Sequence, residues 1–166
     1  MAVTDIRIRN DAQITTTITM TSMTTLVTTN ARQSAVLDFG ATRAQAWLCR
    51  LQATPGAAPT AGSPIEVYIA YASATISTAF PCNLASADST YTGYADASIV
   101  NAKNQLEIVG FMPCTASAVL QTMDVGVICP KLRYGIVVVV NNCLASLSSG
   151  GTHGVSFTPI VDQSGA

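Results

Sequence analysis

The segment from Ala44 to Ala72 constrains the fold of this chain more than any other. Side chains alternate between two sides in Ala44–Ala53 and again in Ile65–Ala72, and a two-residue period is typical of a β-strand. Residues 54–64 between them hold three prolines and two glycines, which interrupt a strand ladder and favour a stiff surface turn. The sequence therefore predicts two long strands joined by an exposed loop. Four residues of these strands are expected in the core: Trp47, Leu51, Val67 and Ile69.

Short segments of similar pattern recur along the chain, and no stretch carries an apolar stripe of helical period with capping residues. The segment 30–34 is expected to be a turn, and residues 73–105 form a long excursion without a regular period. Strands are expected at 14–29 (two, with a break near Ser22), 36–39, 106–112, 118–129, 134–143 and 155–162, where Pro159 indicates an edge position or a bulge. Together these features predict an all-β fold, an antiparallel β-sandwich that is jelly-roll-like and has long irregular loops.

A chain of 166 residues fits one domain. We assign residues 14–166 to a single β-sandwich domain and residues 1–13 to an N-terminal arm. No apolar run approaches the roughly 20 residues of a membrane span, and the first residues lack the apolar region of a secretory signal. We therefore expect no membrane partner and synthesis in a cytoplasm.

Charged side chains are scarce: eight basic and nine acidic residues make up 10% of the chain, against about 25% in an ordinary soluble domain. Because 49% of the residues are apolar, we expect much of the surface to be covered by other protein in an oligomer or assembly. The strand Tyr134–Cys143 is apolar on consecutive residues, so both of its faces need cover, and we expect a neighbouring subunit on one of them. A net charge of -1 offers no basic field to nucleic acid.

Catalytic and metal-binding patterns are missing from the sequence. The five cysteines include no CxxC pair and are expected to be free, buried thiols. His153 is the only histidine and lies in a glycine-rich loop, where a solvated turn residue is expected. The nine acidic residues are dispersed singly. We therefore expect no enzyme activity, no metal and no cofactor.

Three stretches carry a resemblance to a known family: AWLCRLQATPGAAPTAGSPIEVYIAYASA, LRYGIVVVVNNC and HGVSFTPIVDQ. Over residues 35–163 the chain resembles the capsid decoration, or cement, proteins of tailed bacteriophages. The resemblance implies a virion structural protein with a jelly-roll fold, typically a homotrimer. It would bind the major capsid protein on the outside of the phage head and stabilise the head by bridging capsomers. It would be made in the cytoplasm of the host bacterium.

On this basis we expect the arm and the loop 54–64 to contact the capsid, and the strand 134–143 to lie toward the trimer centre. The candidate interface residues are Ile6, Arg7, Ile8, Arg9, Pro55, Pro59, Tyr91, Tyr94, Tyr134 and Val138. An alternative is a tail, fibre or baseplate β-sandwich protein that binds host surface glycans. Its candidate contacts are Tyr91, Tyr94, Asp96 and Trp47, because the YTGYAD segment resembles the aromatic and carboxylate mixture of a sugar-binding loop.

Overall fold

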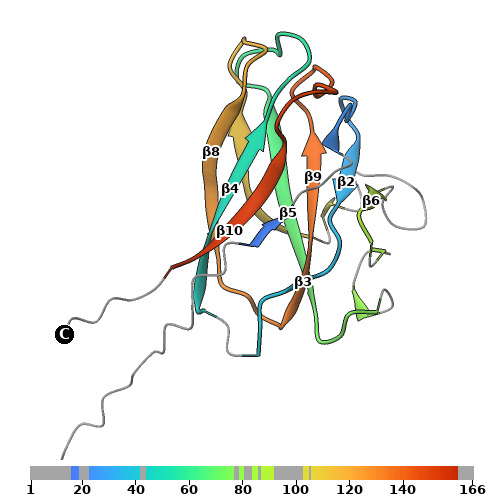
Figure 1. Cartoon of the computed structure of the whole chain (residues 1–166), viewed down its shortest axis with the longest axis vertical. Helices are drawn as coiled ribbons and strands as arrows, with labels where there is room; N and C mark the ends of the chain where they lie inside the picture. Colours follow the sequence, from blue (N-terminus) through green and yellow to red (C-terminus); the bar gives the residue numbers. More distant parts are fainter. Residues whose placement is uncertain are drawn as a thin grey trace, which may run out of the picture.

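The computed structural model of the chain describes residues 16–18, 23–41, 44–76, 79–80, 84–85, 87–91, 103–104 and 106–160, and these form ten β-strands (Figure 1). The strands are β1 (Thr16–Ile18), β2 (Ala31–Gln33), β3 (Leu37–Asp38), β4 (Ala46–Ala53), β5 (Pro64–Ala72), β6 (Ser89–Tyr91), β7 (Glu107–Pro113), β8 (Gln121–Ile128), β9 (Tyr134–Asn141) and β10 (Gly154–Ile160).

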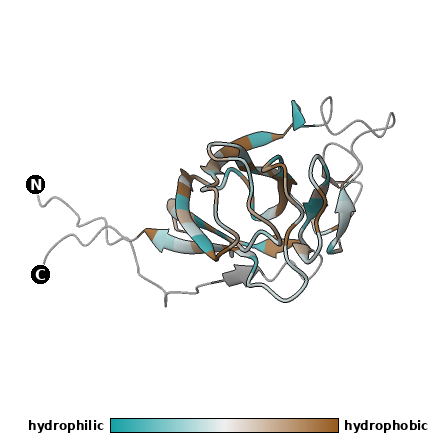
Figure 2. Ribbon diagram, turned by 90° about the horizontal axis from the view of Figure 1, so that it is seen from above, coloured by the Kyte–Doolittle hydropathy of each residue, from teal (hydrophilic) through white to brown (hydrophobic). Residues whose placement is uncertain are grey.

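The strands form two antiparallel sheets. The four-stranded sheet, called sheet A, has the order β1-β10-β4-β8. The six-stranded sheet, called sheet B, has the order β6-β2-β9-β5-β7, and β3 also pairs with β9. Seen from above, the strands surround a common interior (Figure 2). The predicted all-β antiparallel sandwich is confirmed, and the strand-loop-strand unit at 44–72 places β4 in sheet A and β5 in sheet B.

Most predicted strands are present with slightly different ends, whereas the threonine-rich segment differs. Residues 24–29, expected to be strand, form turns in which Thr25 and Thr29 have positive φ angles of 62° and 67°. The segment 30–34, expected to be a turn, contains β2, whose Ala31 pairs with Val140 of β9. Pairing with β9 on one side and β6 on the other therefore makes residues 31–33 a strand, although their composition indicates a turn. Pro159 was expected at an edge or a bulge; it lies in β10, an inner strand of sheet A, where it pairs with Trp47 of β4.

The main core lies between the two sheets. The four residues expected there, Trp47, Leu51, Val67 and Ile69, are all buried. The ring of Phe39 lies edge-on to two other aromatic rings, with centroids 5.5 Å from Trp47 and 6.0 Å from Phe157. The inward side chains of β4, β5, β9 and β10 complete this cluster. The alternation in the sequence therefore gives the correct inner face for β4 and β5.

A second apolar cluster covers the outer face of sheet B. The excursion and its flanks supply Phe80, Leu84, Tyr91 and Leu106, which lie in one cluster with Ile136, Val138 and Val140 of β9. The predicted cover on both faces of β9 is present, but the cover on its outer side comes from the same chain and not from a neighbouring subunit.

Polar contacts fasten this cover to sheet B. The amide of Gln33 is buried, and it donates hydrogen bonds to the carbonyl oxygens of Ala85 (2.6 Å) and Ala87 (3.0 Å). Lys103 Nζ lies 2.9 Å from Glu66 Oε2, which also accepts a hydrogen bond from the Tyr68 hydroxyl at 2.8 Å. Burial acts to raise the pKa of Glu66, but the hydrogen bonds from Lys103 and Tyr68 outweigh it and the pKa is lowered. The cover is thus held by buried and half-buried polar groups as well as by apolar contact.

The edge strands β7 and β8 meet and close one side of the sandwich. Each strand has a bulge, at Val109 and at Val125, and both valines pack against the core. The glycine after each valine faces the other strand: a Cβ on Gly110 would lie 1.9 Å from Val125 O, and one on Gly126 would lie 2.3 Å from Val109 O. Only glycine permits this approach of the two backbones, so these two positions determine how the sheets join.

Candidate interaction surface

The two outer faces of the sandwich differ. The outer face of sheet B lies under the second apolar cluster at β2, β5 and β9, whereas Ile108 and Phe111 on its edge strand β7 are exposed. On sheet A, by contrast, the strand register places alternate residues of β4, β8 and β10 on the outer side, and none of these side chains is buried. They are Ala46, Leu48, Arg50, Gln52, Thr122, Asp124, Val127, Ser156, Thr158 and Ile160. This outer face of sheet A is called the open face below.

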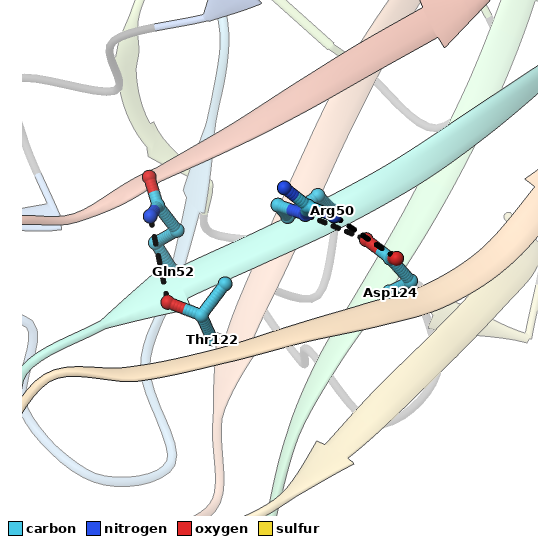
Figure 3. Close-up of polar contacts among 4 residues, drawn as sticks. All are labelled: Arg50, Gln52, Thr122 and Asp124. Atoms are coloured by element: carbon cyan, nitrogen blue, oxygen red, sulfur yellow. Dashed lines mark hydrogen bonds and ion pairs between the residues drawn. The ribbon is translucent and has the colours of Figure 1, made fainter.

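One half of the open face is polar (Figure 3). Arg50 of β4 and Asp124 of β8 form a bidentate ion pair, with Nε–Oδ1 and Nη2–Oδ2 distances of 2.7 Å and 3.1 Å. The hydrogen bond from Arg50 lowers the pKa of Asp124, so the pair stays ionised at neutral pH. Beside it, Gln52 Nε2 donates to Thr122 Oγ1 at 3.4 Å. Because the charges neutralise each other, this half carries hydrogen-bonding groups but no net charge.

The other half of the open face is apolar and continues around the β7–β8 side. Ile160 is 46% exposed and Val127 is 53% exposed, and Leu48 pairs directly with Val127 in the register. Extending the approach of Gly110 to Val125 and of Gly126 to Val109 by one residue brings Ile108 of β7 opposite Val127, while within sheet B Ile108 pairs with Tyr68. Ile108 and Phe111 are 57% and 53% exposed. Ile160, Leu48, Val127 and Ile108 are called the apolar strip, and Phe111 lies three residues further along β7, paired with Glu66.

Such a strip is the kind of surface that marks contact with another protein. Eleven large apolar residues are exposed in the described part of the chain, and three of them, Val119, Leu120 and Met123, lie in the β7–β8 turn and near the start of β8, away from Val127. Single exposed apolar residues are ordinary, but a run across neighbouring strands is not. The geometry supports binding through surface contact.

The interface residues expected from the sequence have little exposed surface where the structure describes them. Ile6, Arg7, Ile8, Arg9 and Tyr94 lie outside the described residues. Pro55, Pro59, Tyr91 and Val138 are buried within the chain. Tyr134 is half-buried, with the Arg133 guanidinium carbon 5.0 Å from its ring centre.

The Pro-rich loop turns two of its prolines inward because it is bonded to the loop before β10. Pro55 forms an isolated bridge with Leu147, and Gly56 N donates to Ser146 O at 2.8 Å. The loop residues that remain exposed are alanine, glycine and threonine, so we correct the expectation that Pro55 and Pro59 themselves face outward. Val138 is likewise corrected, because the excursion covers its face of β9.

The sequence reasoning missed the apolar strip. A strict two-residue alternation along 118–129 puts Val127 on the same side as Met123 and Val125. The bulge at Val125 shifts the register, so Val127 lies on the outer side with Asp124. Neither bulge can be read from the alternation alone.

The two aromatic residues of the glycan alternative that the structure describes are unavailable for stacking on a sugar. Trp47 is 6% exposed and Tyr91 is 3% exposed. Tyr94 and Asp96 lie outside the described residues. No described observation therefore favours the glycan-binding alternative.

His153 was expected to be a solvated turn residue, but it is half-buried and its ring is hydrogen-bonded to two loops. Its Nδ1 accepts a hydrogen bond from Thr54 N at 3.2 Å, and its Nε2 lies 2.8 Å from Ser148 O. This pattern requires the neutral tautomer with the proton on Nε2. The ring thereby joins the start of the Pro-rich loop to the loop before β10.

The cysteine thiols are free where they are described. Cys49, Cys114 and Cys143 are buried as expected, while Cys129 is exposed, which corrects the expectation for that residue. Cys82 lies outside the described residues. Among the described residues no three His, Cys, Asp or Glu side chains gather in a group that could hold a metal ion.

Comparisons with known proteins add no relative: the chain matches no family model, no curated protein and no solved structure. None of the described residues belongs to a helix that is long and apolar enough to cross a membrane.

Proposed function

We propose that this chain is a virion structural protein, the capsid decoration or cement protein of a tailed bacteriophage. In this role it binds the outside of the head and stabilises it by bridging capsomers. The observation that carries the proposal is the open face with its adjoining apolar strip, on a chain with only eight basic and nine acidic residues. Such a surface suits many identical contacts on a shell and requires no catalysis.

The partners in this proposal are the major capsid protein and further copies of the chain, arranged as a homotrimer with jelly-roll subunits. Each bound copy stabilises the assembled head over its separated parts by mass action. The polar half of the open face would fix orientation through hydrogen bonds, while the apolar strip would supply most of the buried area. The arm 1–13 is proposed as an additional contact, and its deletion should weaken binding to heads.

Binding to undecorated heads of the phage that encodes the chain tests the proposal. Purified protein is mixed with such heads, the heads are sedimented, and the bound protein is quantified while the temperature of DNA release is recorded. We expect saturable binding and a higher release temperature. An absence of binding, or location of the protein at the tail in images of virions, would refute the decoration role.

A matched pair of variants tests the surface itself. Val127→Asp places a charge in the apolar strip, and Val27→Asp places the same charge on a valine of similar exposure (50% against 53%) in a turn outside sheet A. We expect Val127→Asp to weaken head binding at least about tenfold, a change of about 1.4 kcal/mol, and Val27→Asp to bind like the unmodified chain. Equal binding by both variants would remove the strip from the proposed contact. Fluorescence of the single tryptophan, Trp47, checks that both variants fold.

A further inference from the structure

A small cleft opens between the turn at residues 24–27 and the strands β2 and β6, which lie at the edge of sheet B away from β7 (Figure 1). It encloses about 200 Å³, less than the roughly 300–1,000 Å³ of sites for drug-sized ligands, so it fits a group the size of one side chain. Its polar lining includes Arg32, Thr90, Thr25 and Asn30, and Val27 adds an apolar wall. The described residues that line it include no carboxylate.

Arg32 is a charged residue on the inner side of sheet B. It pairs with Val139 of β9, which lies in the main core, whereas its neighbour Ala31 pairs with Val140 in the second cluster. Arg32 Nη1 donates to the hydroxyl of Thr90, its register partner on β6. Arg32 Nε is buried and has no hydrogen-bond partner among the described residues. A guanidinium carries five N–H donors, so this one is partly desolvated with too few acceptors.

Arg32 also lacks the counter-charge that other cations of the chain have. The four ion pairs among the described residues are each formed with a carboxylate by Arg50, Lys103, Lys131 and Arg133. Arg32 is the one described cation that these pairs leave out. A partly buried charge without a partner is destabilising, so a bound anion would compensate for a cost that the chain itself does not offset.

Hydrogen bonds to the end of β9 fix the turn that forms one wall of the cleft. Asn141 Nδ2 donates to Leu26 O at 2.8 Å, and Thr29 N donates to Asn141 O at 2.6 Å. Thr25, in the lining, has a φ of 62°, a left-handed conformation that β-branched residues rarely adopt. Backbone strain of this kind is concentrated at binding sites. The cleft is therefore held in shape without a ligand.

We propose that this cleft is a binding site for an aliphatic carboxylate, which pairs with Arg32. One guanidinium supplies a single positive charge, which matches a carboxylate better than a phosphate group of about −1.5 to −2 at neutral pH. The apolar wall at Val27 suits the methylene groups next to the carboxylate. The carboxylate belongs either to a free short-chain acid or to a glutamate side chain of another protein. This inference does not depend on the proposed function.

Titration of the full chain with propionate tests the site, with sodium chloride keeping the ionic strength constant. The Nε–H signal of Arg32 is followed by NMR, and thermal unfolding is measured in parallel. We expect a saturable shift of that signal and a saturable rise in Tm. Arg32→Gln should raise the half-saturating concentration at least about tenfold, because a hydrogen-bonded charge pair is lost. Arg133→Gln is the matched control: it removes an exposed guanidinium that is already paired with Asp38, and it should keep the propionate response.

A second titration identifies the source of the carboxylate. It uses the peptide acetyl-Gly-Glu-Gly-amide and its glutamine counterpart. Saturation by the glutamate peptide alone assigns the site to a protein side chain, whereas saturation by propionate without the peptide assigns it to a free acid.

Two results would overturn the proposal. One is that neither propionate nor the glutamate peptide saturates the Arg32 signal, and the other is that Arg32→Gln responds in Tm like the unmodified chain. Arg32 would then act only as an inward charge that protects the sheet edge from pairing, a role that needs no ligand. The NMR signal comes from the unmodified protein, so it remains decisive if Arg32→Gln does not fold.

Discussion

Replacing Gly110 by alanine tests the closure of β7 on β8, on which the apolar strip depends. The added Cβ would lie 1.9 Å from Val125 O and 2.8 Å from Val125 C. Since nonbonded atoms prefer a separation of about 3.5 Å, the carbonyl would have to retreat by about 1.6 Å. Both clashing atoms belong to the backbone, and β8 is held by its pairing with β4 along its length. No rotamer change relieves the contact. We therefore expect the free energy of unfolding to fall by about 3 kcal/mol, near the upper end of the range for overpacking.

Urea unfolding followed by fluorescence measures this loss, because Trp47 is the only tryptophan and is buried in the core. Gly150→Ala is the matched control: a Cβ at Gly150 meets no atom within 4 Å, and Gly150 is not among the glycines with positive φ. We expect the control to lie within about 0.5 kcal/mol of the unmodified chain. If Gly110→Ala were equally harmless, the two strands would not approach as described, and Ile108 and Val127 would not form one surface.

Three further predictions concern polar side chains that hold loops against the sheets. Gln33→Ala should cost about 1–2 kcal/mol in the same unfolding assay, since it removes the hydrogen bonds between a buried amide and the carbonyl oxygens of Ala85 and Ala87, whereas Gln52→Ala on the open face should change stability by less than about 0.5 kcal/mol. His153→Ala should cost about 1–2 kcal/mol and raise hydrogen exchange in the Pro-rich loop, because both of its ring hydrogen bonds are lost. The lowered pKa of Glu66 means that its contribution is complete above about pH 4.3 and is lost as the pH falls through its folded value. Denaturation from pH 7 to pH 3 should therefore show a weaker acid dependence in Glu66→Gln, and an unchanged dependence would mean that the contact with Lys103 contributes nothing.

The sequence was sufficient for the elements with a local period. Alternation placed β4 and β5 and identified the inner residues Trp47 and Val67, since each strand shows its two faces within a few residues. The same reasoning failed around residue 30, where the short strand β2 depends on β9, more than a hundred residues away. Pairing over such a distance leaves no local pattern in three residues.

The candidate surface was harder to predict because bulges and loop contacts determine it. The bulge at Val125 turns Val127 to the outer side, and strict alternation cannot locate the residue at which the register shifts. Pro55 and Pro59 were expected outside because prolines mark exposed turns, yet the turn is hydrogen-bonded to the loop before β10 and buries them. Composition identifies a loop, but it does not identify what the loop packs against.

The scarcity of charge has two physical sources that composition alone cannot separate. One source is the excursion, because Phe80 and Leu84 pack in the second apolar cluster on the outer face of sheet B. Apolar residues there cover another part of the same chain and not a partner. The rest belongs to the open face and the apolar strip, where the Arg50–Asp124 pair is neutral and Val127 and Ile108 are more than half exposed. Among the described residues, β2, β5 and β9 of sheet B are covered on the outside by the chain itself, whereas the outer side of sheet A and the edge strand β7 are uncovered and partly apolar. This asymmetry is why sheet A and the adjoining β7–β8 side, and not β9, are the place to look for the contact.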